Sequence, residues 1–277
     1  MSLELYILDL GQIRLDRNFI VAGSTYASPG IPGSGAGELT DIPIAAYLVK
    51  HQRGHVLYDT GCHPNCMGSS GRWAAEMQRD FPWTGGEECT LPSRLRALGL
   101  TPDDIPTVVL SHLHCDHAGC VEFFRKSTVY VHEDEFSGAM THYARHNHRS
   151  SYVWKDMDAW MRSPLDWTFV GRDEAEIDLA DGVRILNLGS GHSYGMLALT
   201  VRLQRHRSVL LASDACYCRA NLGPPARVPG ILFDSLGYRR SIDRLNRVAT
   251  DRDLDIWFGH DPEQFATLTK STEGHYD

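Results

Sequence analysis

The chain has 277 residues, of which 42% are hydrophobic and 22% are charged, a composition that suits a globular protein with a full core. A formal net charge of −8 argues against nucleic-acid binding, because neutralising phosphates requires clustered Lys and Arg. The longest apolar run near the start, Ile42–Val49, is far shorter than the ~20 residues that cross a bilayer.

The N-terminus and the cysteines indicate the cellular compartment in which we expect the protein. No basic region followed by an apolar stretch opens the chain, so we expect no export signal and a cytoplasmic location. The seven cysteines are odd in number and none forms a C-x-x-C pair. We therefore expect reduced thiols. We also expect no metal ligation by cysteine, although Cys115 and Cys216 stand beside candidate ligands.

The predicted elements begin with strands at Leu5–Leu10, Ile44–Val49 and Val56–Tyr58, and a hairpin turn at Arg53-Gly54 joins the last two. Between the first two strands, Ser24–Leu39 is rich in Gly, Ser and Pro and is predicted to be a surface loop. The later elements, in chain order, are a helix at Leu91–Gly99, a strand at Thr107–Ser111, a helix at Val121–Phe124, a strand at Thr128–Val131, a helix at Glu133–Tyr143, strands at Val183–Leu188, Leu197–Leu203 and Ser208–Ala212, a helix at Ser241–Val248 and a strand at Leu254–Phe258.

Strands come in adjacent runs in both halves of the chain, with helices between the runs. This order predicts two sheets packed face to face with helices outside, an αββα sandwich of the α+β class, rather than strict alternation of strand and helix. We expect residues 1–277 to form a single domain of this kind.

The segment Ser111–His117 carries three imidazoles and one carboxylate, in the H-x-H-x-D-H pattern of His112, His114, Asp116 and His117. Imidazole nitrogen and carboxylate oxygen are ligands that zinc and similar divalent metals prefer. The run is too short for all four side chains to converge tetrahedrally on one ion, so its spacing suits two ions side by side. Two ions ~3.5–4 Å apart that share an activated water are typical of hydrolytic chemistry.

Three further candidate ligands each follow a predicted apolar strand: His192, Asp214 and His260. Loops at strand ends often carry functional groups on a rigid scaffold. Each of these residues alone could be an ordinary polar loop residue, but together they bring the candidate ligands to the number that a dinuclear site needs. Asp59 and Asp261 are candidates for orienting the ligand imidazoles through hydrogen bonds.

With Asp59-Thr60-Gly61, the His112–His117 run, Gly191-His192, Asp214 and Gly259-His260, the chain resembles the metallo-β-lactamase superfamily. The resemblance implies an αββα fold with a dinuclear metal site between the sheets. It also implies a first metal held by His112, His114 and His192, a second held by Asp116, His117 and His260, and Asp214 bridging them. Relatives with iron redox chemistry usually carry an acid where His114 stands, so His114 favours a zinc-type hydrolase with two Zn²⁺ per chain.

Tyr217, three residues past Asp214, narrows the resemblance to the quorum-quenching N-acyl-homoserine lactonases of this superfamily. The resemblance implies opening of the lactone ring by a hydroxide that the two ions share. Tyr217 would contact the substrate carbonyl, and Asp116 would carry a proton to the leaving oxygen. One departure is Met196, which stands where many members carry a second histidine after the Gly-His ligand.

Alternatives remain open on the sequence alone. The same site could act on another lactone, on a thioester as in glyoxalase II, or on a β-lactam, and a non-catalytic metal-binding or signal-binding module is the remaining rival. We expect a small acyl lactone as the partner, with no nucleic acid and no membrane, and a monomer or a homodimer. Six residues could line an acyl channel or pack in the core: Phe81, Trp83, Tyr152, Trp154, Met157 and Trp160. A further cluster of His142, His146 and His148 is interpreted as a solvated basic face.

Overall fold

A computed structural model describes residues 3–25, 30, 35–148 and 150–277. Within these residues one sheet has the strand order β4-β1-β2-β3-β5-β6-β7 and the other has the order β12-β11-β10-β9-β8. The strands of the first sheet are β1 (Glu4–Asp16), β2 (Leu39–Lys50), β3 (Val56–Tyr58), β4 (Trp83–Thr84), β5 (Thr107–Val109), β6 (Thr128–His132) and β7 (Asp166–Val170). The strands of the second sheet are β8 (Glu176–Ala180), β9 (Val183–Gly189), β10 (Met196–Val201), β11 (Val209–Ser213) and β12 (Asp255–Phe258).

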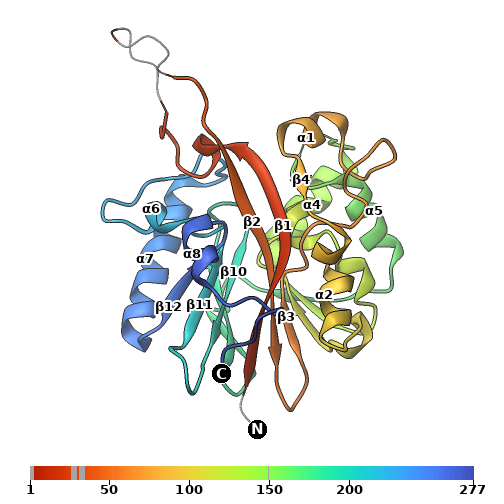
Figure 1. Cartoon of the computed structure of the whole chain (residues 1–277), viewed down its shortest axis with the longest axis vertical. Coiled ribbons are helices and arrows are strands. Elements are labelled where there is room, and N and C mark those ends of the chain that lie inside the picture. The colour runs from red at the N-terminus through yellow and green to blue at the C-terminus, as the bar shows by residue number, and fades with distance from the viewer. Residues whose placement is uncertain (1–2, 26–29, 31–34, 149) are drawn as a thin grey trace.

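Helices lie on both outer sides of the paired sheets (Figure 1). On the side of the first sheet are α1 (Ala75–Asp80), α2 (Leu91–Ala97), α3 (Cys115–Ala118), α4 (Glu133–Ala144) and α5 (Trp154–Arg162). On the other side are α6 (Arg219–Leu222), α7 (Ser235–Arg252) and α8 (Pro262–Thr267). Short 3₁₀ turns span Arg17–Phe19, Glu87–Cys89, Pro102–Asp104 and Val121–Phe123. The predicted αββα sandwich is thereby confirmed.

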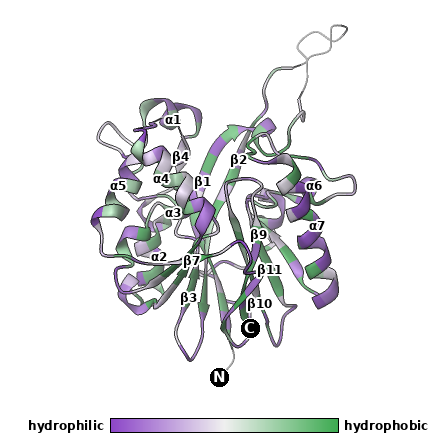
Figure 2. Ribbon diagram, turned by 180° about the vertical axis from the view of Figure 1, so that it is seen from behind, coloured by the Kyte–Doolittle hydropathy of each residue, from purple (hydrophilic) through white to green (hydrophobic). Residues whose placement is uncertain are grey.

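The core between the two sheets explains why several strands are apolar along their whole length. Residues such as Ile7 and Val109 from the first sheet pack against Leu199 and Leu211 from the second. Every residue of β10 and β11 is buried. The inner face of this second sheet packs against the first sheet, and helices cover its outer face. Figure 2 shows the strands as mostly hydrophobic and the residues of α7 as largely hydrophilic.

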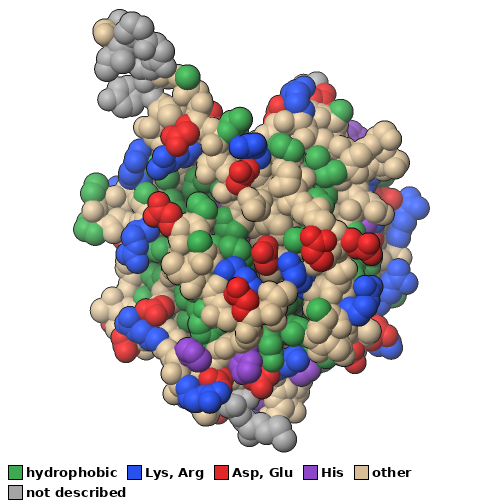
Figure 3. All heavy atoms as spheres, viewed as in Figure 1, with side chains coloured by type: hydrophobic (Ala, Val, Ile, Leu, Met, Phe, Trp, Pro, Cys, Tyr) green, Lys and Arg blue, Asp and Glu red, His purple; other side chains and the backbone are tan. Residues whose placement is uncertain are grey.

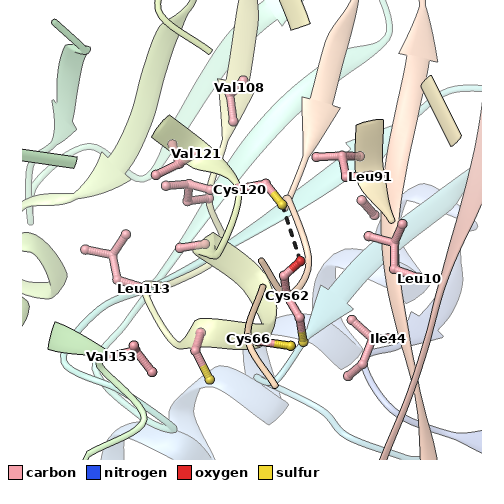
Figure 4. Close-up of a cluster of buried hydrophobic side chains, with 14 of the residues drawn as sticks. Leu10, Ile44, Cys62, Cys66, Leu91, Val108, Leu113, Cys120, Val121 and Val153 are labelled. Atoms are coloured by element: carbon pink, nitrogen blue, oxygen red, sulfur yellow. Dashed lines mark hydrogen bonds between the residues drawn. The ribbon is translucent and has the colours of Figure 1, made fainter. Parts of the chain in front are cut away.

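Several cysteines belong to the second core region, between the first sheet and its helices. Cys115 is buried in this region, and Cys62, Cys66 and Cys120 lie among aliphatic side chains (Figure 4), where the Cys120 thiol donates a hydrogen bond to the Cys62 carbonyl at 3.3 Å. Burial raises the pKa of the Cys62, Cys115 and Cys120 thiols well above its usual range. These thiols therefore stay protonated and pack as small hydrophobic groups.

The structure differs from the predicted elements mainly at their ends and in one helix. The strand expected at Leu5–Leu10 continues to Asp16, and the helix expected at Ser241–Val248 begins at Ser235 and ends at Arg252. The helix expected at Val121–Phe124 is only a 3₁₀ turn, because three residues cannot propagate an α-helix. Half of the loop predicted at Ser24–Leu39 lies outside the described residues, and Leu39 itself begins β2.

The surface carries mixed charges, and the described helices are unlike membrane spans. On the face in Figure 3, basic and acidic side chains are interspersed rather than gathered into fields of one sign. Among the helices of the described residues, none combines the length and the apolar character that a membrane crossing requires.

The ends of several strands converge on one edge of the sandwich and place the candidate ligands there. β3 pairs with β5 in parallel, and β11 pairs with β12 in parallel, so the carboxyl ends of each pair meet. The Tyr58 hydroxyl donates to the Leu197 carbonyl at 2.8 Å, and the Leu197 amide donates to the Ser111 carbonyl at 2.9 Å. These bonds fix the two sheets against each other beside the His112–His117 run.

Candidate metal centre

The structure brings all seven predicted ligands together from four strand ends and one short helix. They form two sets in which the donor atoms lie within 4.8 Å of one another. We define the first ligand group as His112, His114, His192 and Asp214, and the second ligand group as Asp116, His117 and His260. All but Asp116 are buried, and Asp116 is half-buried. Among the described residues, no other cluster of this kind is present.

Asp214 lies between the two ligand groups and presents one oxygen to each. Its Oδ2 is 3.2 Å from Nε2 of His192 and 3.8 Å from Nε2 of His112. Its Oδ1 is 2.9 Å from Nε2 of His260 and 3.2 Å from Nε2 of His117. A carboxylate in this position can bridge two ions, which is the arrangement that the resemblance implied.

Gly259 allows the ends of β11 and β12 in the second sheet to approach each other closely. An added Cβ at Gly259 would lie 2.6 Å from the backbone carbon of Ser213, closer than real side chains pack. Without a side chain there, the loop after β12 closes against the end of β11. His260 thereby reaches the carboxylate of Asp214.

Buried polar atoms in the centre lack hydrogen-bond partners among the described residues. They include Nε2 of His112, His117 and His260 and Oδ1 of Asp214. Buried polar atoms without partners are rare in folded proteins and carry a desolvation penalty. These atoms face one another at ion-pair distances without hydrogen-bond geometry, as ligands aimed at a common cation do. The residues present therefore fit a pair of divalent ions.

The opposite nitrogen of four imidazoles contacts a group that holds the ring in place. Nδ1 of His117 lies 2.9 Å from Oδ2 of Asp59, and Nδ1 of His260 lies 2.9 Å from the Pro43 carbonyl. In the first ligand group, Nδ1 of His192 lies 3.3 Å from the Ile231 carbonyl. The remaining contact is between Nδ1 of His112 and the Ser111 hydroxyl, at 3.0 Å. Such contacts set the tautomer and orientation that leave Nε2 free for a metal.

Asp59 plays the orienting part predicted for it, whereas Asp261 does not. Asp59 also accepts hydrogen bonds from the Ser111 amide and hydroxyl, at 2.7 and 2.8 Å. Its backbone has a φ of 61°, an uncommon conformation for a residue other than glycine that persists at functional sites. Asp261 instead caps α8 by accepting from the Glu263 and Gln264 amides, so the prediction for Asp261 was wrong.

The electrostatics of the centre favour cation binding. Burial lowers the pKa of His112 and His192, and it lowers that of His114 to about 3, so these rings are neutral and ready to donate a lone pair. Burial alone would raise the pKa of Asp116, but nearby His117 and His260 lower it to about 2. Around His117, the attraction of Asp214, Asp116 and Asp59 outweighs burial and raises the pKa. The carboxylates of Asp116 and Asp214, whose pKa values the nearby histidines lower, are therefore ionised at neutral pH.

Tyr217 lies at the same centre, as the sequence predicted. Its side chain is buried, and its hydroxyl is 3.2 Å from Nδ1 of His192. Its ring lies 5.2 Å from the His260 ring, centroid to centroid, so the phenol borders both ligand groups. Burial, together with the charges of Asp214 and Asp116, raises the pKa of Tyr217 well above its usual range. The phenol therefore remains a hydrogen-bond donor at neutral pH.

Other residues singled out in the sequence fall in different surroundings. Met196 is buried in the core of the second sheet, and Met157 and Trp160 are buried residues of α5, so these side chains pack rather than line a channel. The interpretation of a solvated basic face is wrong for His142. Its ring stacks on Tyr152 at 4.9 Å, whereas His146 and His148 are exposed. The sequence carries no periodic signal that distinguishes His142 from its two neighbours.

Comparisons with known proteins give the class that this fold and site define. The family model described as the Metallo-beta-lactamase superfamily matches residues 39–206, which is more than half of the chain. Two proteins named N-acyl homoserine lactonase AiiB, from Agrobacterium fabrum and Rhizobium rhizogenes, are 54% and 53% identical over 277 residues, and both alignments cover 100% of each chain. The chain belongs to the N-acyl homoserine lactonase family of this superfamily.

Solved structures share the architecture from end to end. An N-acyl homoserine lactone hydrolase with the product N-hexanoyl-L-homoserine bound at its catalytic metal center matches with a TM-score of 0.79 and 27% identity, covering 100% of both chains. A variant of AiiA from B. thuringiensis, with N-decanoyl-L-homoserine bound at the active site, matches with the same score, identity and coverage. The family and the donor set together imply a hydrolase whose two ligand groups hold divalent metal ions.

Proposed function

We propose that this chain hydrolyses the ester bond of N-acyl-homoserine lactones, with two Zn²⁺ ions held by the first and second ligand groups. The observation that carries the proposal is the Tyr217 phenol, which borders both ligand groups in a chain 54% identical along its full length to AiiB. Five imidazoles and two carboxylates are a donor set that suits zinc. Bound ions supply Lewis-acid polarisation of the ring carbonyl and lower the pKa of a water molecule toward ~7.

Tyr217 would stabilise the negative charge that develops on the carbonyl oxygen. Nε2 of His192 faces the ligand group, so its Nδ1 carries the ring proton and can donate to the Tyr217 oxygen at 3.2 Å. The phenolic hydroxyl, which also interacts with the Asp214 carboxylate, would turn its proton toward the carbonyl oxygen when substrate binds. A preorganised donor of this kind typically contributes ~2.7–4 kcal/mol to the transition state.

Asp116 would move the proton that the reaction releases. It is the ligand with the most exposed side chain among the two groups, at 16%, and it is ionised at neutral pH because its pKa is about 2. It can therefore take the proton of the attacking water and deliver it to the ring oxygen as the ester C–O bond breaks. The product is the N-acyl-homoserine with a free hydroxyl and a carboxylate.

The test compares an ester, a thioester and an amide as substrates of the zinc-loaded protein, and the metal content is measured in the same preparation. The substrates are N-hexanoyl-homoserine lactone, a glutathione thioester and the β-lactam nitrocefin. We expect kcat/KM for the lactone to exceed the other two by at least about tenfold, or ~1.4 kcal/mol, with ring-opened product seen by chromatography. A higher kcat/KM for the thioester or the β-lactam would show that this compound, and not the lactone, is the preferred substrate. A protein that carries two ions and turns over none of the three would instead indicate a binding module.

A further inference from the structure

The carboxylate of Glu135 joins the two loops that carry the imidazoles of the first ligand group. Glu135 lies in the first turn of α4 and its side chain is fully buried. Its Oε1 accepts a hydrogen bond from the Leu113 amide at 2.9 Å, and its Oε2 accepts one from the Gly195 amide at 3.1 Å. Leu113 stands between His112 and His114, and Gly195 follows His192 closely. One side chain therefore spans segments about 80 residues apart in the sequence.

Tyr152 extends this network to a ligand side chain. Its hydroxyl donates to Oε1 of Glu135 at 2.9 Å, and its ring meets the His114 imidazole edge-on, with centroids 4.8 Å apart. The orientation of His114 thus depends on Glu135 through its neighbouring backbone and through the tyrosine that packs against its ring.

The surface of α4 is shaped to seat the loop that follows His192. A Cβ added at Gly138 would lie 2.3 Å from the Tyr194 ring, so the absence of a side chain lets this loop lie against the helix. Close packing on α4 and the bond from the Gly195 amide to Glu135 together leave the loop little freedom. The Leu113 and Gly195 amides and the Tyr152 hydroxyl all present N–H or O–H groups to Glu135, so a carboxylate, whose oxygens both accept, fits this position better than an amide.

We propose that Glu135 is a positioning residue that sets the geometry of the first ligand group and thereby its affinity for a metal ion. The inference rests on the metal centre proposed above and does not depend on the identity of the substrate. Partners that orient metal ligands typically change metal affinity by 10–100-fold when they are replaced.

The test is E135Q, with metal affinity measured by chelator competition. The amide keeps the size of the side chain, but its NH₂ must face either the Leu113 amide or the Gly195 amide, where two donors would oppose each other. We expect one of the two ions to bind about 10–100-fold more weakly, while the other is held nearly as in the wild type. In the Co²⁺-substituted protein, we expect the absorption bands of only one of the two ions to change.

Two control variants separate positioning from a general loss of stability. E133Q changes a neighbouring acid on the same helix whose side chain is 44% exposed. D156N changes an equally buried carboxylate whose hydrogen-bond partner is Arg72 rather than a ligand loop. Both controls should retain wild-type metal affinity, even where D156N alters the melting temperature.

Wild-type affinity for both ions in folded E135Q would overturn the proposal, and so would an equal loss of affinity in D156N. If E135Q does not fold, the metal affinity of Y152F tests the proposal instead, because this variant removes a single hydrogen-bond donor to Glu135 and keeps the ring beside His114. It should weaken one ion in the same direction by a smaller factor, and unchanged affinity in Y152F would overturn the proposal. The outcome is distinct from a failure of lactone hydrolysis, because no substrate enters the measurement.

Discussion

Oδ2 of Asp59 and Nδ1 of His117 lie 2.9 Å apart, although Asp59 follows β3 and His117 lies in α3, 58 positions later. Asp59 is held in place by both the amide and the hydroxyl of Ser111, so it approaches His117 as a fixed group. The contact directs Nε2 of His117 toward Asp214 and Asp116, at 3.2 and 3.5 Å. The second ligand group is therefore ordered from behind by a residue that does not itself face the metal site.

The variant D59N tests this relationship. Loss of the carboxylate charge removes the partner that orients His117, so we expect the second ligand group to bind its ion about 10–100-fold more weakly. Metal analysis after dialysis should then give fewer than two ions per chain. The matched control is D261N, which should keep its metal and lose little stability, because Asn caps a helix about as well as Asp does. Two tightly bound ions in D59N would contradict the assignment.

The variant Y217F should lower kcat for lactone hydrolysis by about 100-fold or more, because it removes a donor to the developing oxyanion. KM and metal content should change little, since the ring that packs beside His192 and His260 remains. Y238F is the control: the Tyr238 hydroxyl is buried without a hydrogen-bond partner among the described residues, so its removal should leave kcat unchanged. A kcat for Y217F equal to that of the wild type would remove Tyr217 from the mechanism.

Removal of the metal ions should destabilise the fold. An ion that binds only the folded chain adds about 4 kcal/mol of stability at a concentration of about 1,000 Kd. For a domain of this size, stripping the ions should lower the Tm by on the order of 10 °C. Thermal scans of the chelated protein, repeated after Zn²⁺ is restored, measure the effect. If the chelated, metal-free protein has the same Tm as the metal-loaded protein, metal binding by the ligand groups does not contribute to the stability of the fold.

The buried carboxyl of Asp156 should make stability depend on pH. Burial raises its pKa from 3.8 to about 7, even though Arg72 donates to it at 3.0 Å, because Oδ2 has no partner among the described residues. Between these two pH values the folded chain binds a proton that the unfolded chain has released. The contribution of this group to the free energy of unfolding is therefore present at low pH and is lost as the pH rises toward 7.

Urea unfolding of the wild type and D156N at about pH 5 and about pH 8 measures this dependence. We expect the wild type to gain stability relative to D156N at the lower pH, by up to ~1.4 kcal/mol per pH unit within the window. The comparison between the two proteins cancels groups that titrate in both. A stability difference that is independent of pH would show that Asp156 remains ionised in the folded chain.

Local patterns in the sequence predicted much of the fold and of the site. Apolar runs such as Ser208–Ala212 predicted strands because a strand covered on both faces needs apolar residues throughout. β8 was missed because this edge strand is half exposed, and α5 was missed because its aromatic residues were interpreted as a channel. The importance of Glu135 could not be predicted, because an acid near a helix start is already explained by the helix dipole.

The sequence by itself determined which donor atoms are available and their order along the chain, because the identity of a side chain sets its metal chemistry wherever the backbone carries it. Only the tertiary structure decided which oxygen of Asp214 faces which ligand group and which partner orients each imidazole. These contacts join residues far apart in the chain, as Asp59 with His117 and Glu135 with Gly195 show, and their geometry exists only once the two sheets have packed.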